Sequence, residues 1–210
     1  MHSFFEGLTK KEDKIFKKLN TPQQIQDFLE SIPINFEEKE NTLYSPRNVL
    51  VKKKAHCFEG ALFGAAVLMY HSKPAILIDL QPELSDEAHT VALYKKHGKW
   101  GAISKTNHAV LRFRDPVYKS PRELAMSYFH EYFLDNGVKT LRTYTVFNLD
   151  KIKRNWIIDK NNLWYINKAL DKSKYINLIN SKESSGLRKA DLIERETGKV
   201  LVWKKGRKEH

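Results

Sequence analysis

The chain has 210 residues, of which 41% are hydrophobic, and it carries a formal net charge of +12. This length and apolar content predict one domain over residues 1–210 with a sizeable core, because no internal repeat, low-complexity segment or Pro/Gly-rich linker divides the sequence. The single cysteine excludes an intramolecular disulfide, and no stretch approaches the roughly 20 apolar residues of a membrane span. Since no long apolar segment follows the N-terminus either, we expect a cytoplasmic protein with no membrane span.

The basic excess raises the question of anionic partners such as nucleic acid. The basic residues form short groups with acidic residues between several of them, and no recognised nucleic-acid motif accompanies them; the groups are Lys10–Lys11, Lys17–Lys18, Lys52–Lys54, Lys95–Lys96 and the tail with Lys204, Lys205, Arg207 and Lys208. We therefore expect most of them to be solvated, with at most weak, nonspecific binding of anions or nucleic acid.

Two helices are predicted before residue 33. Apolar residues in a charged background indicate a helix over 9–19. A second helix over 21–32 has a marked start, because Thr21 suits an N-cap, Pro22 the first helical position and Gln24 the reciprocal arm of a capping box. The polar stretch that follows predicts irregular structure up to residue 50, with a turn or short helix start at its Ser-Pro pair.

The segment from Cys57 to Tyr70 is apolar on every side and rich in glycine and alanine, which is typical of a buried, closely packed helix. Cys57 stands on its first turn, where unpaired N–H groups and the helix dipole favour a thiolate and can hold an oxyanion. Lys52–Lys54 and His56 add positive potential. The alternative for Cys57 is a small, unreactive core residue.

The next elements are predicted to be strands. The run at 74–80 is continuously apolar, which indicates a strand in a sheet covered on both faces. Residues 88–94 alternate in polarity, and 99–104 follow after a turn that contains Gly98, so these two segments form a β-hairpin.

The length of the hairpin loop decides which residue faces His89. A three-residue loop, His97 to Lys99, places Asn107 opposite His89, whereas a loop of even length places Thr106 there. We expect the three-residue loop.

The remaining chain is predicted as mixed elements. A strand at 109–113 precedes a turn at Asp115-Pro116, a helix with a capping box follows over 120–137, and 140–147 has the composition of a strand. The segment 148–210 is expected to be a helical extension in several pieces.

A cysteine on a helix, a histidine on a strand and a polar residue on the neighbouring strand are the parts of a thiol nucleophile site. The thiol needs a base that takes its proton and later delivers it to the leaving group, and an imidazole does both near neutral pH. His89 is our candidate, with a buried structural histidine as the alternative. Asn107 would orient the far ring nitrogen, and N–H groups at the start of the Cys57 helix would hold the oxyanion.

Three stretches together resemble a known family. They are Lys54-Ala-His-Cys57-Phe-Glu-Gly60-Ala-Leu, then Ala-His89-Thr-Val-Ala, then Gly98-Lys-Trp100-Gly-Ala-Ile. In order and spacing, over roughly residues 47–107, they are similar to the core of the transglutaminase-like superfamily of papain-type cysteine enzymes. The resemblance implies a cysteine-bearing helix packed on an antiparallel sheet that carries the histidine and the third residue.

The third catalytic position departs from the family pattern. The family usually has an aspartate four residues after the tryptophan, where this chain has Ser104. We choose Asn107 as the substitute, with Ser104 and Thr106 as alternatives. Asp79 and Asp86 are weaker choices, because neither is expected on a strand beside the histidine strand.

These observations predict an α+β protein with a papain-type core at about 45–147. Its expected function is cleavage or transfer of an amide acyl group by a Cys-His(-Asn) catalytic triad, most simply as a peptidase or amidase with a peptide or amide substrate, no cofactor and no metal. The resemblance also implies an alternative, because the superfamily includes inactive members that bind DNA: a catalytically inactive module for nucleic acid or another anionic partner. A third alternative is a globular scaffold in which the cysteine and histidine are merely buried.

Overall fold

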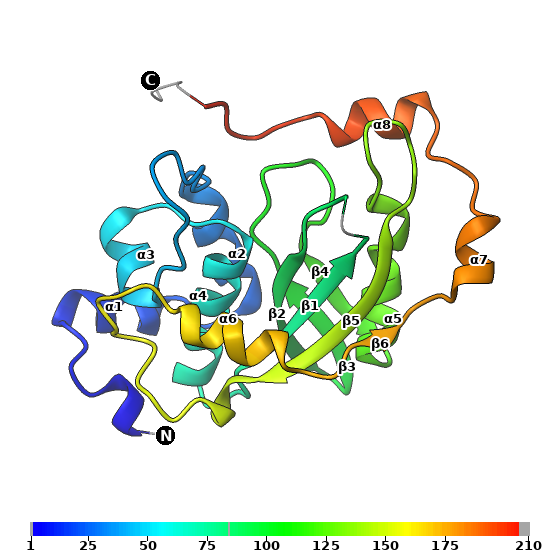
Figure 1. Ribbon diagram of the computed structural model, residues 1–210. Helices are drawn as coiled ribbons and strands as arrows, with labels where there is room; N and C mark the ends of the chain where they lie inside the picture. Colours follow the sequence, from blue (N-terminus) through cyan, green and yellow to red (C-terminus); the bar gives the residue numbers. More distant parts are fainter. Residues whose placement is uncertain (1, 84, 206–210) are drawn as a thin grey trace.

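A computed structural model of the protein describes residues 2–83 and 85–205 (Figure 1). One antiparallel sheet lies at its centre, with the strand order β4-β3-β2-β1-β5-β6. The strands are β1 (Ile76–Pro82), β2 (His89–Lys96), β3 (Lys99–Ile103), β4 (Arg114–Tyr118), β5 (Leu141–Asn148) and β6 (Ile176–Asn177).

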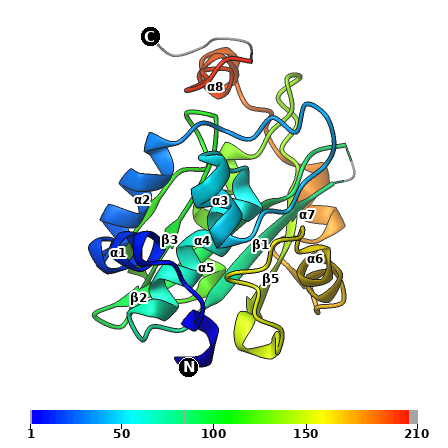
Figure 2. The same cartoon turned by 90° about the vertical axis from the view of Figure 1, so that its left-hand side faces the viewer.

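Helices cover both faces of this sheet. Helices α1 to α4 gather on one side of it, and α5 packs on the other (Figures 1 and 2). The first group comprises α1 (Lys10–Lys18), α2 (Pro22–Ser31), α3 (Pro46–Lys52) and α4 (Cys57–Tyr70); α5 is Pro121–Ser127, and the later helices are α6 (Trp164–Asp171), α7 (Ser181–Ser185) and α8 (Leu192–Gly198). Three short 3-10 helices complete the described elements: η1 (His2–Phe5), η2 (Phe129–Glu131) and η3 (Leu149–Lys151).

Helix α4 is buried from its second residue to its thirteenth and packs on β1 and β2. Its small residues allow this close approach: a Cβ added at Gly64 would lie 3.3 Å from the side chains of both Ala92 and Ile103. The α4 face and the α5 face of the sheet each carry a separate apolar core. The predictions of a cysteine-bearing helix on an antiparallel sheet, and of a first strand covered on both faces, are therefore confirmed, and this α+β arrangement is consistent with a transglutaminase-like architecture.

The predicted hairpin register is wrong. Lys96 pairs with Lys99, so the loop has two residues, His97 and Gly98, with φ of +49° and +77°. Two successive residues with positive φ are the mark of a type I′ turn, whose twist matches that of the strands. The strand order also corrects the expectation that Asp79 does not lie on a strand beside the histidine strand. Strand β1 pairs directly with β2, and Asp79 is next to Leu80, which pairs with His89.

Two later elements differ from the predictions. The strand expected at 109–113 lies at 114–118 instead and includes Pro116, which an edge strand accommodates because one row of its backbone groups has no partner in the sheet. The helix expected over 120–137 ends at Ser127, and η2 follows it. Of the predicted extension 148–210, residues 206–210 lie outside the described residues, and with them Arg207 and Lys208 of the basic tail.

Across residues 2–83 and 85–205, no helix combines the length and the apolar character that crossing a lipid bilayer requires.

Candidate active site

Cys57 is the first residue of α4, as the sequence predicts. Its side chain is half-buried, and its Sγ lies 4.0 Å from the carbonyl oxygen of Ala88, the residue before β2. The Phe58 N–H is bonded to a ring nitrogen of His56, whereas the Cys57 N–H has no hydrogen-bond acceptor among the described residues. That N–H is therefore available beside the sulfur to stabilise an oxyanion.

His89 begins β2 and is 5% exposed. Its Nε2 lies 2.9 Å from the Ser104 hydroxyl oxygen, and the same hydroxyl donates to the carbonyl oxygen of Leu111 at 2.6 Å. Because a hydroxyl has a single proton to donate, Ser104 must accept a hydrogen bond from His89. The neutral imidazole consequently carries its proton on Nε2, which leaves Nδ1 as the basic nitrogen.

The backbone of Ser104 is fixed by Gln26 of α2. Gln26 Oε1 accepts from the Ser104 N–H at 2.9 Å, and Gln26 Nε2 donates to the Ser104 carbonyl at 2.7 Å. Both residues are buried. Gln26 therefore holds the residue that orients His89, and no local sequence pattern could have indicated it, because the two partners are 78 residues apart.

The surroundings of Cys57 favour its thiolate. Burial by itself would raise the pKa of the thiol, but hydrogen-bonding contacts with His56 and His89 and the charge on the two rings outweigh burial and lower that pKa to about 5. A cysteine with this pKa is almost wholly ionised at neutral pH, which is the state that acts as a nucleophile.

His56 is a second imidazole beside the sulfur, which the sequence indicated only as a source of positive potential. His56 is the N-cap of α4. Its Nδ1 accepts a hydrogen bond from the Phe58 N–H at 3.2 Å, and its Nε2 donates to the Thr42 carbonyl at 3.0 Å. Burial opposes protonation, whereas contacts with Cys57 and Glu59 raise the pKa of His56 to about 9.

A charged ring cannot accept the Phe58 hydrogen bond, so the helix cap and the ion pair with the thiolate compete for Nδ1 of His56. His89 has no such competing bond on its Nδ1 among the described residues. Among the described residues, His89 is therefore the imidazole beside Cys57 whose Nδ1 no other group occupies.

Glu59, in the first turn of α4, is fully buried and holds the segment from Asn35 to Tyr44 by hydrogen bonds. Its carboxylate accepts from the side chains of Asn35 and Thr42 and from the backbone N–H groups of Tyr44 and His56, at 2.7 to 3.3 Å. The spacing of His56 and Glu59, three residues apart at a helix start, is a signal that the sequence does contain.

The other predicted third residues are not bonded to His89. The side-chain amide of Asn107 exchanges two hydrogen bonds with the backbone of Trp203, at 2.8 and 3.0 Å. The Thr106 hydroxyl accepts from the backbone N–H of His108, and the Asp86 carboxylate accepts from the hydroxyl of Thr140, just before β5. The residue that meets His89 is Ser104, at the position where the resembled family has its aspartate.

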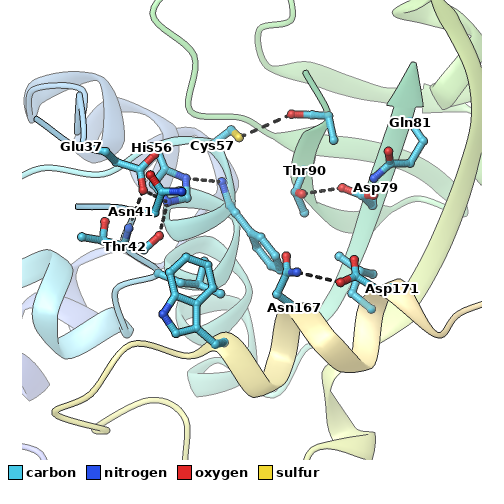
Figure 3. A pocket seen from close by; sticks show the side chains of 15 residues that line it. Glu37, Asn41, Thr42, His56, Cys57, Asp79, Gln81, Thr90, Asn167 and Asp171 are labelled. Carbon is cyan, nitrogen blue, oxygen red and sulfur yellow. Dashed lines mark hydrogen bonds and ion pairs between the residues drawn. The ribbon is translucent and has the colours of Figure 1, made fainter. Parts of the chain in front are cut away.

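Two cavities meet at Cys57. One, of about 250 Å³, lies toward β1 and α6 and is shown in Figure 3. The other, of about 610 Å³, lies on the side of His89 and Tyr132 and carries side chains of both charges. No group of three or more His, Cys, Asp or Glu side chains in the described part of the chain has an arrangement that could hold a metal ion.

Comparison with known proteins gives a distant likeness. No family model and no curated protein matches the chain. Among solved structures, the chain is similar to Legionella pneumophila LapG in its calcium-bound form, with 12% identity and a TM-score of 0.38, and in its EGTA-treated form, with 13% identity and a TM-score of 0.37. The alignments cover 45% of this chain and 61% and 59% of the two LapG chains. This chain thus spans less than two thirds of LapG, and a likeness at this level carries no argument about its activity.

Proposed function

We propose that the protein is a transglutaminase-like cysteine enzyme that cleaves or transfers the acyl group of an amide, with Cys57 as nucleophile, His89 as acid and base, and Ser104 as the residue that orients the imidazole. The observation that carries this proposal is the pair of hydrogen bonds at the Ser104 hydroxyl, which leave Nδ1 of His89 free beside a thiol of low pKa. A merely structural histidine has no need of a fixed tautomer next to an ionised cysteine.

The first half of the reaction forms an acyl-enzyme. The Cys57 thiolate attacks the amide carbonyl carbon, a C–S bond forms, and the carbonyl electron pair moves to the oxygen, where the Cys57 N–H donates to it. The tetrahedral intermediate then collapses as the C–N bond breaks. His89 delivers the proton on Nδ1 to the leaving nitrogen, so the amine departs neutral and the ring is left with its proton on Nε2.

The second half releases the acyl group. Nδ1 of His89 takes a proton from water as the water oxygen attacks the thioester carbonyl, and collapse of this intermediate breaks the C–S bond. The carboxylic acid leaves, and the thiolate and the imidazolium are restored. If an amine replaces the water, the same steps transfer the acyl group to the amine.

A peptide is the substrate that best fits the cavities. They extend from Cys57 in two directions, so a chain can occupy both sides of the sulfur while its carbonyl lies beside the thiolate. A small amide would occupy only one of them.

Incubation with a proteome-derived peptide mixture tests the proposal. We expect new peptide termini in mass spectra with the wild type and none with Cys57→Ala, and an acyl adduct on Cys57 when the reaction is quenched early. Added hydroxylamine should divert products to hydroxamates, since it competes with water for the thioester. Equal cleavage by wild type and Cys57→Ala, or an unmodified peptide mixture, would refute the enzymatic role.

The binding-module alternative gives the opposite result in a simple control. It predicts salt-dependent binding to nucleic acid that is unchanged by Cys57→Ala, because phosphate contacts carry the affinity. The low pKa of Cys57 and the tautomer of His89 have no role in that alternative, which is why the enzyme is the proposal favoured here.

A further inference from the structure

The smaller cavity beside Cys57 differs in charge from the rest of the protein. Figure 3 shows Glu37 on one of its sides and Asp79 and Asp171 on the other. None of the described residues that line it is a lysine or an arginine, and its one basic side chain is His56, whose Nε2 lies 3.9 Å from the carboxylate of Glu37. In a chain with a net charge of +12, a wall with three carboxylates and a single histidine is opposite in sign to the average surface.

Asp79 is the buried member of this wall, at 2% exposed. Its carboxylate accepts hydrogen bonds from Thr90 at 2.6 Å, Gln81 at 2.7 Å and Tyr175 at 2.9 Å. Three donors on one carboxyl group are the pattern of an ionised, acceptor-only group. Its partners are all neutral, and no ion pair reaches it from the described residues.

An ionised carboxylate held by neutral donors is costly to bury, and a cation that enters from the cavity would offset part of that cost. The remaining walls suit such a cation. Trp164 of α6 lines the cavity and is 40% exposed, so its ring is open to contact, and tryptophan is the side chain that attracts cations most strongly through its ring face. Asp171 is exposed at the C-terminal end of α6, where its carboxylate accepts a hydrogen bond from Asn167 at 2.9 Å.

We infer that this cavity binds a cationic group of the substrate, an ammonium or guanidinium next to the amide that Cys57 attacks, with Asp79 and Asp171 supplying the negative potential and Glu37 balanced by His56. This inference names a substrate class for the proposed function and rests on it. Among the products of the peptide-mixture experiment, lysine or arginine is then enriched beside the cleaved bond.

Charged thiol reagents test the inference without requiring turnover. Cys57 is the only cysteine, and its thiolate attacks the sulfur of a methanethiosulfonate to form a mixed disulfide while methanesulfinate leaves. Rates are measured in about 0.15 M salt, where screening over about 8 Å suppresses the field of distant charges. The reagents are the trimethylammonium-ethyl and the sulfonato-ethyl forms, each rate divided by that of the same reagent with 2-mercaptoethanol.

We expect the cationic reagent to have the larger normalised rate by about tenfold, since a cleft lined by one sign of charge concentrates the opposite ion. Asp171→Asn, a change at an exposed site, should reduce that preference, and Asp79→Asn should reduce it further. Asp150→Asn makes the same charge change after β5, near the end of β1 that is far from His89, and should leave the preference unchanged.

Equal normalised rates, a preference for the anionic reagent, or no reaction with either reagent would overturn the inference, as would the same loss of preference in Asp150→Asn and Asp171→Asn. A cation preference in a protein that cleaves no peptide would leave the inference standing and remove the proposed function. Peptide cleavage without a cation preference would do the reverse.

Discussion

Acidification separates a catalytic Cys57 from an ordinary thiol more sharply than a rate at neutral pH does. Lowering the thiol pKa from 9.0 to about 5 raises the thiolate fraction at pH 7 about 100-fold, but it weakens each thiolate as a nucleophile by about 40- to 100-fold, because nucleophilicity follows pKa with a slope of about 0.4–0.5. The two effects nearly cancel at neutral pH. At about pH 5.5 the gain in thiolate fraction is roughly 2,000-fold, so Cys57 should react about 20 to 60 times faster than a free cysteine.

The assay is the rate of reaction with a neutral disulfide reagent from about pH 4 to about pH 9, with N-acetylcysteine as the reference thiol. We expect the rate to rise with a midpoint near the pKa of about 5 and then to level off. His89→Ala and His56→Ala should each move the midpoint upward, because both rings stabilise the thiolate. A wild-type midpoint above about 8, the range of an unperturbed thiol, would refute the reasoning.

Three further predictions concern the residues around the site. Ser104→Ala should lower kcat about tenfold or more, because His89 loses the partner that fixes its tautomer, whereas an unchanged kcat would remove Ser104 from the mechanism. Gly60→Ala should cost about 1–3 kcal/mol in urea unfolding, because the added Cβ overlaps the Lys105 Cβ, while Gly64→Ala, with contacts of 3.3 Å, should cost less; equal costs would contradict the packing. Burial lowers the pKa of Lys105 to about 8, so the unfolded chain binds more protons than the folded chain between about pH 8 and 10.5. Stability relative to Lys105→Met should therefore rise by about 3 kcal/mol across that window, and a flat difference would show that Lys105 is not desolvated.

The sequence was sufficient to predict the parts of the site that depend on local pattern. Cys57 stands at the start of a helix without a polar face, and His89 stands at the start of a strand; both positions are visible over a few residues. The register between strands was not predictable in the same way, because it depended on whether His97 adopts a positive φ, which is uncommon outside glycine even for the residue types enriched there, histidine among them. The one-residue error in loop length led directly to Asn107.

The residue that is hydrogen-bonded to His89 shows why spacing along the chain was a better guide than side-chain chemistry. Asn107 was preferred because the expected register placed it opposite His89 and because an amide can orient an imidazole, but its amide bonds to the backbone of Trp203. Ser104 occupies the position four residues after Trp100 and meets His89 with a hydroxyl. A hydroxyl fixes the tautomer as a carboxylate does, although it brings no negative charge to stabilise the imidazolium.

The site also depends on a helix outside the core predicted at 45–147. Lys105, next to Ser104, is 2% exposed and donates from Nζ to the carbonyls of Leu29 at 2.8 Å and Ile32 at 2.6 Å, at the C-terminal end of α2. Gln26 of the same helix holds both backbone groups of Ser104. Four hydrogen bonds thus connect α2 with the residues that follow β3. Two involve the side chain of Gln26, and two are donated by the side chain of Lys105.

Through these hydrogen bonds the buried Lys105 helps to fix the position of its neighbour Ser104. A displacement of α2 would move the Ser104 hydroxyl. That movement would break the hydrogen bond from Nε2 of His89, which fixes the tautomer of the ring. The ammonium at the helix C-terminus is favourably placed against the negative end of the helix dipole, which offsets part of its burial cost. The geometry at Nδ1 of His89 is therefore set in part by contacts that begin at α2 and pass through Ser104.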